Sequence, residues 1–441
     1  MNKDFGSNFK NWTGSIAFKG IVTFFLGLLI LIPVGQIKSL LSEREFRMYS
    51  VKEEVIDKWG GLQYLAGPIL VIPVVEHYTE VFDNKKELMV RRHYLHILPD
   101  ELKISGDLES EIRKKGIYNI ELYTGNFIIQ GSFKGTDEPV IPYKDSEILW
   151  GEAELIIGLG DVKGLSGKVD LQWEDKGYDF EGGAGKSGIF QSGIHISLAL
   201  EQDQTYSFQV KLELRGGESI SFLPLGKETN VNINSNWPSP NFQGAFLPDS
   251  HNINDTDFSA NWNIHALARN FPQTWLDNQI DYLTLQEGSF GVNFISPVDG
   301  YFKNHRAIKY RLMFIFIPFI ALFLFEIFTK TKVHPFQYLL TGFAISMFFL
   351  LLLSISEHLN FSISYLVSAV ASSLMISAYT GSVFKSKVKG LTMAGINIVL
   401  YVYLYMSLAS EDYALIIGSI GLFVILAITM IITRKLNWYK L

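Results

Sequence analysis

Glu357 and His358 form the pair of neighbouring side chains that is best suited to acid–base chemistry in this chain. A histidine titrates near pH ~6.5, and an adjacent carboxylate favours its charged form. The pair could therefore exchange protons at an exposed site. It could instead cap and polarise a hydrogen-bonded turn between two helices, and we favour this structural interpretation.

Residues 185–187, which read Gly-Lys-Ser, resemble the end of a phosphate-binding loop. The full loop needs a glycine five residues before Gly185, where this chain has Phe180. The residues that follow, 189–200, read as a strand, whereas a bound phosphate would need the N-terminus of a helix. We therefore predict a glycine-rich β-turn here.

Two groups of residues carry side chains that can bind metal ions. His93 and His96 are three residues apart, which on a strand places them on opposite faces, so they cannot share an ion. A later loop is rich in side-chain oxygen atoms, from Asp249, Asn252, Asn254, Asp255 and Asp257. It lacks the glycine and the final glutamate of an EF-hand loop, so we expect a solvated turn.

Catalytic motifs are missing as well. The sequence contains neither the Gly-x-Ser-x-Gly pattern of a nucleophile elbow nor the His-Glu-x-x-His pattern of zinc peptidases. We expect no catalytic residue, no metal ion and no cofactor, although enzymatic activity stays an open question.

Six apolar segments are long enough to cross a lipid bilayer, which needs about 20 residues of helix. The first, residues 16–41, follows several lysines, and we interpret it as an uncleaved anchor because no small-x-small cleavage site follows it. The other five lie at residues 312–328, 339–355, 359–379, 391–408 and 413–432. Backbone groups in hydrocarbon must be hydrogen-bonded internally, so each segment is expected to be a helix. We predict an integral membrane protein.

The charges of the short loops predict the orientation. Basic clusters at residues 330–332, 385–389 and 434–440 alternate with turns at 357–358 and 411–412 that carry carboxylates. Basic loops stay in the cytoplasm, so we expect both termini inside and the long segment after the first span outside. Four basic residues at the outer end of the second span run against this pattern: Lys303, Arg306, Lys309 and Arg311.

The net charge of −6 hides a strong division along the chain. Residues 1–41 carry a net charge of +3 and residues 306–441 a net charge of +7, whereas residues 42–305 hold 23 basic and 39 acidic side chains. We therefore divide the chain into a cytoplasmic N-terminus with the first helix (1–41), an extracytoplasmic domain (42–305) and a five-helix bundle with a cytoplasmic C-terminus (306–441). The acidic domain argues against nucleic acid as a partner.

The acidic domain is predicted to be mostly β-structure. Residues 194–200 and 206–214 alternate apolar and polar side chains, and we interpret them as a half-buried hairpin. Similar runs occupy 74–82, 88–98, 102–108, 119–133, 153–162 and 229–233, whereas helical periodicity is limited to 43–59 and 271–286. These patterns predict an α+β membrane protein with a large antiparallel β domain. A duplicated β-sandwich with a boundary near Pro142 is one alternative.

The predicted spans contain few ionisable residues, which would be expected along an ion or proton path, so a transporter is the least favoured function. Glu326 lies inside a span, four residues before Lys330, and we expect the two to form an ordinary helical ion pair. The span at 359–379 has two rows of small residues that would let helices approach closely: Ser364, Ser368 and Ser372, and Ala369, Ser373 and Ser377. We interpret Tyr401, Tyr403 and Tyr405 as interfacial anchors.

Several motifs occur together between about residue 36 and residue 379. They read Gly-Pro-Ile-Leu-Val-Ile-Pro at 67–73, Ser-Asn-Trp-Pro at 235–238, Ala-Arg-Asn-Phe-Pro-Gln at 268–273, His-Pro-Phe-Gln-Tyr at 334–338 and Leu-Leu-Leu-Leu-Ser-Ile-Ser-Glu-His at 350–358. With these motifs the chain resembles the CreD family of inner membrane proteins, also called cell envelope integrity proteins. It departs visibly from the family at Val74, where an aromatic residue is frequent.

The resemblance implies a place in the inner membrane of a Gram-negative bacterium, with the β domain in the periplasm. It also implies a link to envelope and carbon-source responses, colicin tolerance and β-lactam susceptibility, but no reaction, so no catalytic residue can be transferred. The motif residues that we retain as candidates are Gly67, Pro68, Trp237, Pro238, Arg269, His334, Pro335, Gln337, Tyr338, Ser356, Glu357 and His358. We interpret them first as architectural residues.

Two functions remain in competition. The first is a non-enzymatic protein that supports envelope integrity and the envelope stress response, with a periplasmic β domain that binds a ligand or partner. The second is a membrane enzyme, or a protein that handles lipids or cell-wall precursors, with a site at the outer bilayer surface near Arg269, Glu357 and His358. The expected partners are the lipid bilayer and a periplasmic protein, membrane protein or cell-wall ligand.

Overall fold

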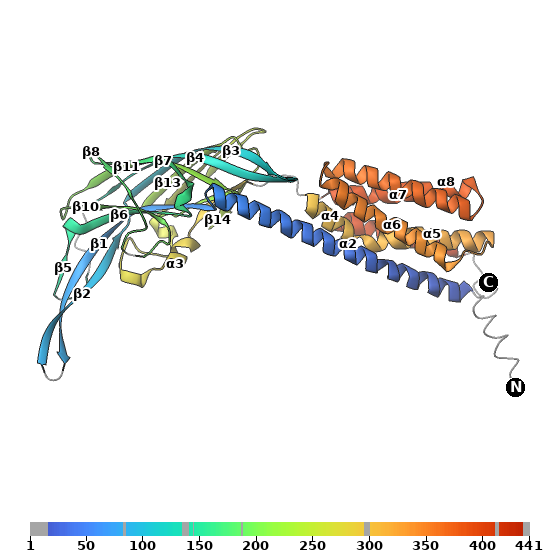
Figure 1. Ribbon diagram of the computed structural model, residues 1–441, viewed down its shortest axis with the longest axis horizontal. Coiled ribbons are helices and arrows are strands. Elements are labelled where there is room, and N and C mark those ends of the chain that lie inside the picture. The colour runs from blue at the N-terminus through green and yellow to red at the C-terminus, as the bar shows by residue number, and fades with distance from the viewer. Residues whose placement is uncertain are drawn as a thin grey trace. The chain divides into compact units, whose positions relative to one another are not determined.

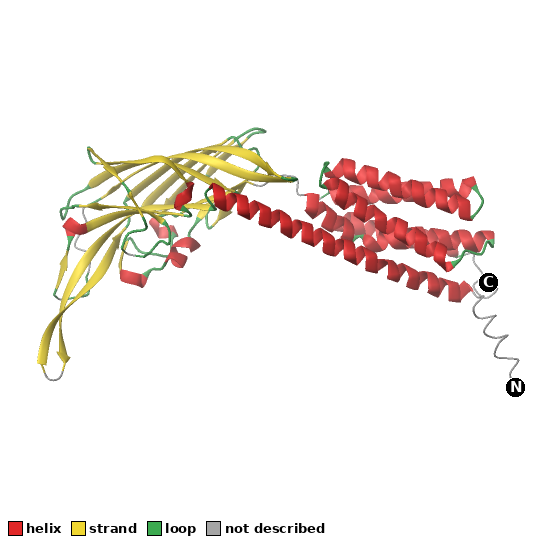
Figure 2. Cartoon of the chain, viewed as in Figure 1, coloured by secondary structure: helices red, strands yellow, loops and turns green. Residues whose placement is uncertain are grey.

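The computed structural model describes residues 16–82, 85–134, 141–143, 145–186, 188–294, 300–410 and 414–434. The chain divides into two compact units (Figure 1). The helical unit comprises Met1–Met48 and Val298–Leu441, and the β unit comprises Tyr49–Pro297. The β unit contains all of the described strands (Figure 2).

Six of the described helices are long and apolar enough to span a membrane. They are α2 (Ile16–Trp59), α5 (Arg311–Thr329), α6 (Pro335–Ser356), α7 (Phe361–Val383), α8 (Lys387–Ala409) and α9 (Ala414–Thr433), and the short helix α4 (Gly300–Lys309) precedes α5. All six predicted spans are confirmed. The helix predicted at 43–59 is the continuation of α2, because residues 36–59 contain neither glycine nor proline to interrupt it.

One stripe of α2 packs into the bundle. Ile30, Val34, Ile37 and Leu41 recur every three or four residues and are buried, so they share one face of the helix. Gly342 of α6 permits a close approach, since a Cβ atom there would lie 2.3 Å from Cγ1 of Ile30. This glycine therefore lets α2 lie directly against α6.

The serine-rich helix α7 packs between α6 and α8, as its small residues predict. Ser364, Ser368 and Ser372 are all buried. Small side chains at these positions let the neighbouring helices approach closely. The prediction of a closely packed fourth span is confirmed.

The tyrosines of α8 bind neighbouring helices. Tyr401 donates a hydrogen bond to Oγ of Ser372 on α7 (3.0 Å), and Tyr403 donates to a backbone carbonyl of α9. Tyr405 donates to Oγ of Ser362 (2.9 Å). Tyr401 is only 5% exposed, so its interpretation as an interfacial anchor was wrong. Its hydroxyl group is satisfied inside the bundle.

The β unit contains eighteen strands in the described residues, together with the short helix α3 (Tyr282–Glu287). The strands are β1 (Gln63–Phe82), β2 (Lys85–Ile97), β3 (Glu101–Lys115), β4 (Tyr118–Phe133), β5 (Ser146–Ile148), β6 (Ala153–Leu159), β7 (Leu165–Trp173), β8 (Lys176–Asp179), β9 (Glu181–Gly182), β10 (Gly193–Leu198), β11 (Tyr206–Gly217), β12 (Ser219–Phe222), β13 (Glu228–Ser235), β14 (Pro240–Gly244), β15 (Ser250–Ile253), β16 (Phe258–His265), β17 (Thr274–Leu276) and β18 (Phe290–Phe294).

These strands form two sheets around one core. One sheet has the order β14-β18-β12-β1-β6-β10-β9, with β2 and β5 paired to β1 and β17 paired to β2, and the other has the order β15-β16-β13-β3-β4-β11-β7-β8. Aromatic rings from both sheets meet between them, such as Phe127 with Phe222 and Trp262 with Phe290. Both sheets mix strands from before and after Pro142, so the alternative of two sandwiches with a boundary there is wrong.

The predicted hairpin at 194–214 is also wrong, although both of its strands exist. β10 pairs with β6 and β9 in one sheet, whereas β11 pairs with β4 and β7 in the other. Alternating burial arises in both strands because each turns one face to the shared core. Periodicity identifies a half-buried strand, but it does not identify its partner.

Two further differences concern contacts that are distant in sequence. β1 pairs with β12 and β3 pairs with β13 in parallel, so the sheets are mixed and not purely antiparallel. Parallel neighbours need long connections, which local patterns do not reveal.

The helical pattern at 271–286 contributes only α3, because β17 and a turn occupy its first half.

Candidate functional site

His334 and Pro335 begin helix α6. Nδ1 of His334 accepts a hydrogen bond from the backbone N–H of Phe336 (3.2 Å), and the side chain of Gln337 accepts one from the backbone N–H of His334 (2.9 Å). Pro335 stands in the first turn, where its missing N–H has no helical partner to lose. The predicted start of this span is confirmed, and three motif residues account for it.

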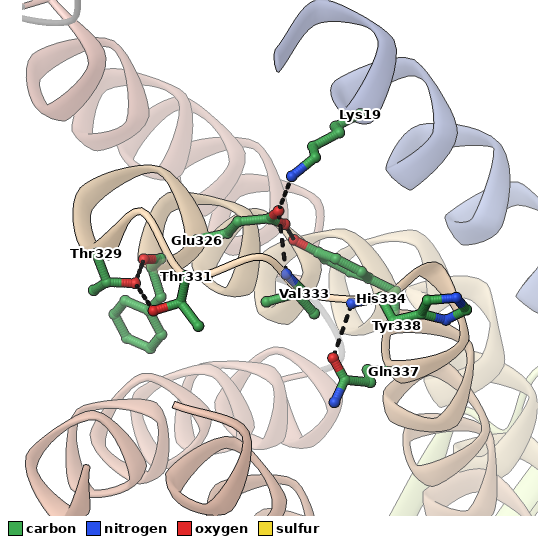
Figure 3. Close-up of polar contacts among 9 residues, drawn as sticks. Lys19, Glu326, Thr329, Thr331, Val333, His334, Gln337 and Tyr338 are labelled. Atoms are coloured by element: carbon green, nitrogen blue, oxygen red, sulfur yellow. Dashed lines mark hydrogen bonds and ion pairs between the residues drawn. The ribbon is translucent and has the colours of Figure 1, made fainter. Parts of the chain in front are cut away.

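Tyr338, the last residue of that motif, belongs to a buried polar cluster around Glu326 (Figure 3). The Glu326 carboxylate accepts hydrogen bonds from the Tyr338 hydroxyl (2.9 Å) and the backbone N–H of Val333 (3.3 Å), and it pairs with Lys19 of α2 (2.5 Å). The predicted helical ion pair between Glu326 and Lys330 is therefore wrong. α5 ends just before Lys330, which takes a left-handed conformation (φ 54°) and loses the helical spacing.

Ser356 and Glu357 hold the opposite end of α6. Asn304 of α4 donates from Nδ2 to Oγ of Ser356 (2.8 Å), and the Tyr301 hydroxyl donates to Oε1 of Glu357 (3.3 Å). Nε of Arg44 on α2 lies 3.8 Å from the same oxygen. The Glu357 carboxylate therefore joins α2 and α4 to the end of α6.

His358 does not take part in this arrangement. Its side chain is exposed, and in the described part of the chain no ion pair connects it to Glu357. The histidine that does meet a carboxylate at this end is His305, whose Nε2 lies 2.9 Å from Oε2 of Glu45. Glu357 and His358 are thus adjacent in sequence without forming a proton-transfer pair, which favours the structural interpretation.

Arg269 is buried in the β unit and binds backbone carbonyls. Its Nη1 donates to the carbonyl oxygens of Pro224 and Leu225 (both 2.8 Å), and its Nη2 donates to the side chain of Gln273. Gln273 in turn donates to the carbonyl of Leu98 (2.9 Å). Burial lowers the pKa of Arg269 to about 10, so the side chain still carries its charge at neutral pH. Its donors tie three segments of the β unit together.

The remaining motif residues shape the backbone of the β unit. Gly67 has a φ of +111°, which favours glycine, and a Cβ atom there would lie 2.9 Å from a carbonyl oxygen of β6. Gly67 and Pro68 interrupt the regular pairing of β1 with β6. Trp237 is buried and donates from Nε1 to the carbonyl of Ser239 (3.1 Å), with Pro238 between them. Within the β unit, no hydrogen bond among the described residues joins Gly67 or Trp237 to the side chain of Arg269.

His93 lies between two carboxylates, an arrangement that the sequence analysis missed. Its Nδ1 is 2.5 Å from Oδ2 of Asp277 and its Nε2 is 3.0 Å from Oε2 of Glu76, while its ring stacks on Tyr143. Burial lowers the pKa of His93, but the hydrogen bonds and charges of Glu76 and Asp277 outweigh it, so the pKa is raised. His93 connects β1, β2 and the turn after β17 through these two carboxylates.

This geometry predicts a pH-dependent contribution to stability. The pKa of His93 is higher in the folded than in the unfolded protein. Its contribution to folding stability is therefore complete at pH values below the unfolded-state pKa of about 6.5, and it is lost as the pH rises through the folded-state pKa. We expect the melting temperature of His93→Gln to fall furthest below wild type in acid, with the difference shrinking above that pH. Melting followed by tryptophan fluorescence measures this, with the exposed His251→Gln as control. A difference that does not change with pH would contradict it.

His96 faces the other side of β2, as the spacing predicts. It stacks on Trp275, and burial lowers its pKa to about 4. Across the described residues no group of three histidine, aspartate or glutamate side chains is placed to hold a metal ion. In the loop that resembled a phosphate site, Lys186 instead forms an ion pair with the buried Glu154 (3.0 Å).

A two-stranded ribbon of the β unit is a second feature that the sequence analysis missed. Residues 77–82 of β1 pair with residues 85–90 of β2 and with no third described strand, because the pairing of β1 with β5 ends at Glu76. This β1–β2 ribbon extends beyond the rest of the sheet (Figure 1). Leu88, Met89 and Val90 on it are 71%, 40% and 58% exposed. The run was predicted as a strand, but no local signal shows that a neighbouring strand is missing.

Known proteins resemble this chain over most of its length. The family model described as inner membrane protein CreD matches residues 15–439. Inner membrane protein CreD of Escherichia coli (strain K12) is 30% identical over 416 residues, which cover 93% of this chain and 91% of that protein. Both matches run through the helical unit and the β unit alike, and the chain belongs to the CreD family of inner membrane proteins.

Proposed function

We propose that this inner membrane protein supports the integrity of the cell envelope without catalysing a reaction, and that its β unit binds a partner protein in the periplasm. The β1–β2 ribbon is the observation that carries this proposal. A two-stranded hairpin is marginally stable by itself in water. Contiguous exposed apolar side chains mark interaction surfaces in soluble domains.

The ribbon offers a partner two kinds of contact. Successive side chains of a strand point to opposite faces, so Leu88 and Val90 present one apolar face and Met89 the other. The outer edges of both strands lack a neighbouring strand in the described residues. Such edges can accept an added strand from another protein through backbone hydrogen bonds. A protein partner with an exposed strand fits both features.

Helix α2 gives the β unit a covalent route to the membrane. Its residues up to Met48 belong to the helical unit, and those from Tyr49 onward belong to the β unit. There Lys52 pairs with Glu121 (2.9 Å), and the ring of Trp59 is covered by the guanidinium group of Arg113 (3.7 Å). Binding at the β unit can therefore act on a transmembrane helix without any further component.

The enzymatic alternative lacks a comparable observation. The Arg269 side chain donates its hydrogen bonds to backbone carbonyls and to Gln273 inside the β unit. Glu357 accepts a hydrogen bond from Tyr301 inside the helical unit. Residues that are engaged in this way serve the architecture of their own unit. We therefore propose partner binding and not catalysis.

The periplasmic placement rests on the alternation of basic and acidic loops. It is tested with a reporter that fluoresces only in the cytoplasm. Fused after Leu441, the reporter should fluoresce; inserted at Asp203, in an exposed turn of the β unit, it should stay dark. The opposite pattern would overturn the placement.

Partner binding is tested by photo-crosslinking in intact cells. A photoreactive amino acid at Leu88 is expected to give a discrete crosslinked product of higher mass, which Met89→Asp in the same chain should abolish. The same probe at Leu267, which is 92% exposed on another loop of the β unit, serves as the matched control and should give no such product. The absence of a product at Leu88, or an equal product at Leu267, would overturn the proposal.

A further inference from the structure

Helix α4 lies at one end of the helical unit (Figure 1). Asn304 donates to Ser356 at the end of α6 (2.8 Å), and Arg306 donates to two backbone carbonyls at the end of α8 (3.1 and 3.0 Å). The ammonium group of Lys303 lies 5.8 Å from the ring centre of Phe361 at the start of α7. These helices span the membrane, so their ends mark the boundary between lipid and water, and α4 lies at that boundary.

The two faces of α4 differ in the way that is typical of an interfacial helix. Asn304, Ala307 and Ile308 are buried against the bundle. On the opposite face Phe302 is 54% exposed and Lys309 is exposed. This outward face combines an aromatic ring with positive charge, as helices at a lipid head-group region do.

The positive charge at this end has no protein counterpart in the described residues. Glu357 and Glu45, the carboxylates that α4 approaches, already bind Arg44 and His305. None of the lysine and arginine side chains from position 303 to 311 lies within 4.0 Å of a described carboxylate. They are Lys303, Arg306, Lys309 and Arg311, the same four that run against the charge pattern of the loops. A role in binding would explain why these four charges lie at this end of the bundle.

We propose that α4 and the first turn of α5 form a binding surface for the head groups of anionic phospholipids. Lys303, Lys309 and Arg311 supply the charge that attracts a lipid phosphate, and Phe302 reaches the upper part of the acyl chains. Arg306 is held by the carbonyls of α8 and positions the helix. This surface is independent of the β1–β2 ribbon and does not rest on the proposed function.

The test uses the full-length protein reconstituted in lipid bilayers. The chain has no cysteine, so Leu312→Cys, an exposed position beside Arg311, gives a single site for a fluorophore. Phosphatidylglycerol and phosphatidylcholine, each with a spin label on its acyl chain, are compared at equal mole fraction as quenchers. We expect stronger quenching by phosphatidylglycerol, and a loss of this preference of up to about fivefold for each basic residue removed at low salt.

The decisive variant is Lys303→Gln, Lys309→Gln and Arg311→Gln together, which should quench equally with both lipids. A matched control removes three lysines at the other end of the bundle, Lys385, Lys387 and Lys389, and should keep the preference. Equal quenching in wild type, or a preference that survives the first triple substitution, would overturn the proposal. Competition by inorganic phosphate beyond that of chloride at equal ionic strength would assign the surface to a soluble anion and would also overturn it.

Discussion

Replacing Arg269 with methionine is expected to destabilise the β unit by on the order of 3–5 kcal/mol. The substitution leaves the carbonyl oxygens of Pro224 and Leu225 and the side-chain oxygen of Gln273 without their donor, and each unsatisfied buried group costs about 1–3 kcal/mol. Methionine fills most of the volume, so the loss would come from hydrogen bonding and not from a cavity.

Thermal melting of the detergent-solubilised protein, followed by tryptophan fluorescence, measures this loss. Six of the eight tryptophans lie in the β unit, so the signal reports mainly on that unit. Arg92→Met is the matched control because this arginine is 56% exposed and meets Glu152 only at 3.8 Å; it should change the free energy of unfolding by less than about 0.5 kcal/mol. Equal melting temperatures for the two variants would show that Arg269 does not hold the loops.

Replacing Ser368 with leucine is expected to disrupt the packing of the bundle. Ser368 is fully buried on α7, and additional carbon atoms in a packed interior cost about 1–3 kcal/mol, occasionally more. The Ser368 hydroxyl has no hydrogen-bond partner among the described residues, so Ser368→Ala should be nearly neutral. The comparison isolates the effect of volume.

The yield and melting temperature of the solubilised variants provide the measurement. Val370→Leu, on the same helix at a position that is 49% exposed, should resemble wild type because its side chain can extend into lipid or detergent. If Ser368→Leu matched Val370→Leu in both quantities, Ser368 would not lie in a closely packed interface.

The elements of this fold were predictable where the signal is local. Apolar length alone identifies the six spans, and alternation identifies most strands of the β unit. Pairing is a property of two distant segments, and for this reason β10 and β11 were joined in one hairpin although they lie in different sheets. The missing third strand beside Leu88 and Val90 is undetectable for the same reason, since those residues alternate and read like any strand.

The same distinction applies to the candidate residues. The capping role of His334 and Pro335 depends on neighbours within three positions, and it was predicted. The partner of Glu326 is Lys19, which lies in the first span, and no local spacing connects the two. Glu357 similarly binds Tyr301 and lies near Arg44, residues from two other helices. Sequence proximity suggested Lys330 as the partner of Glu326 and His358 as the partner of Glu357. In the structure, both glutamates instead contact residues that are distant in sequence.

The central claim, partner binding through the β unit and not catalysis, is tested most directly by complementation. Two double variants are expressed in a strain that lacks the protein and shows an envelope-stress phenotype: Leu88→Ser with Val90→Ser, and Glu357→Gln with His358→Asn. Leu88 and Val90 are exposed, and glutamine and asparagine keep the volume and hydrogen bonding of Glu357 and His358, so both variants should accumulate at wild-type levels. We expect the ribbon variant to fail and the Glu357/His358 variant to complement nearly as well as wild type. A fully active ribbon variant together with an inactive, normally folded Glu357/His358 variant would contradict the claim.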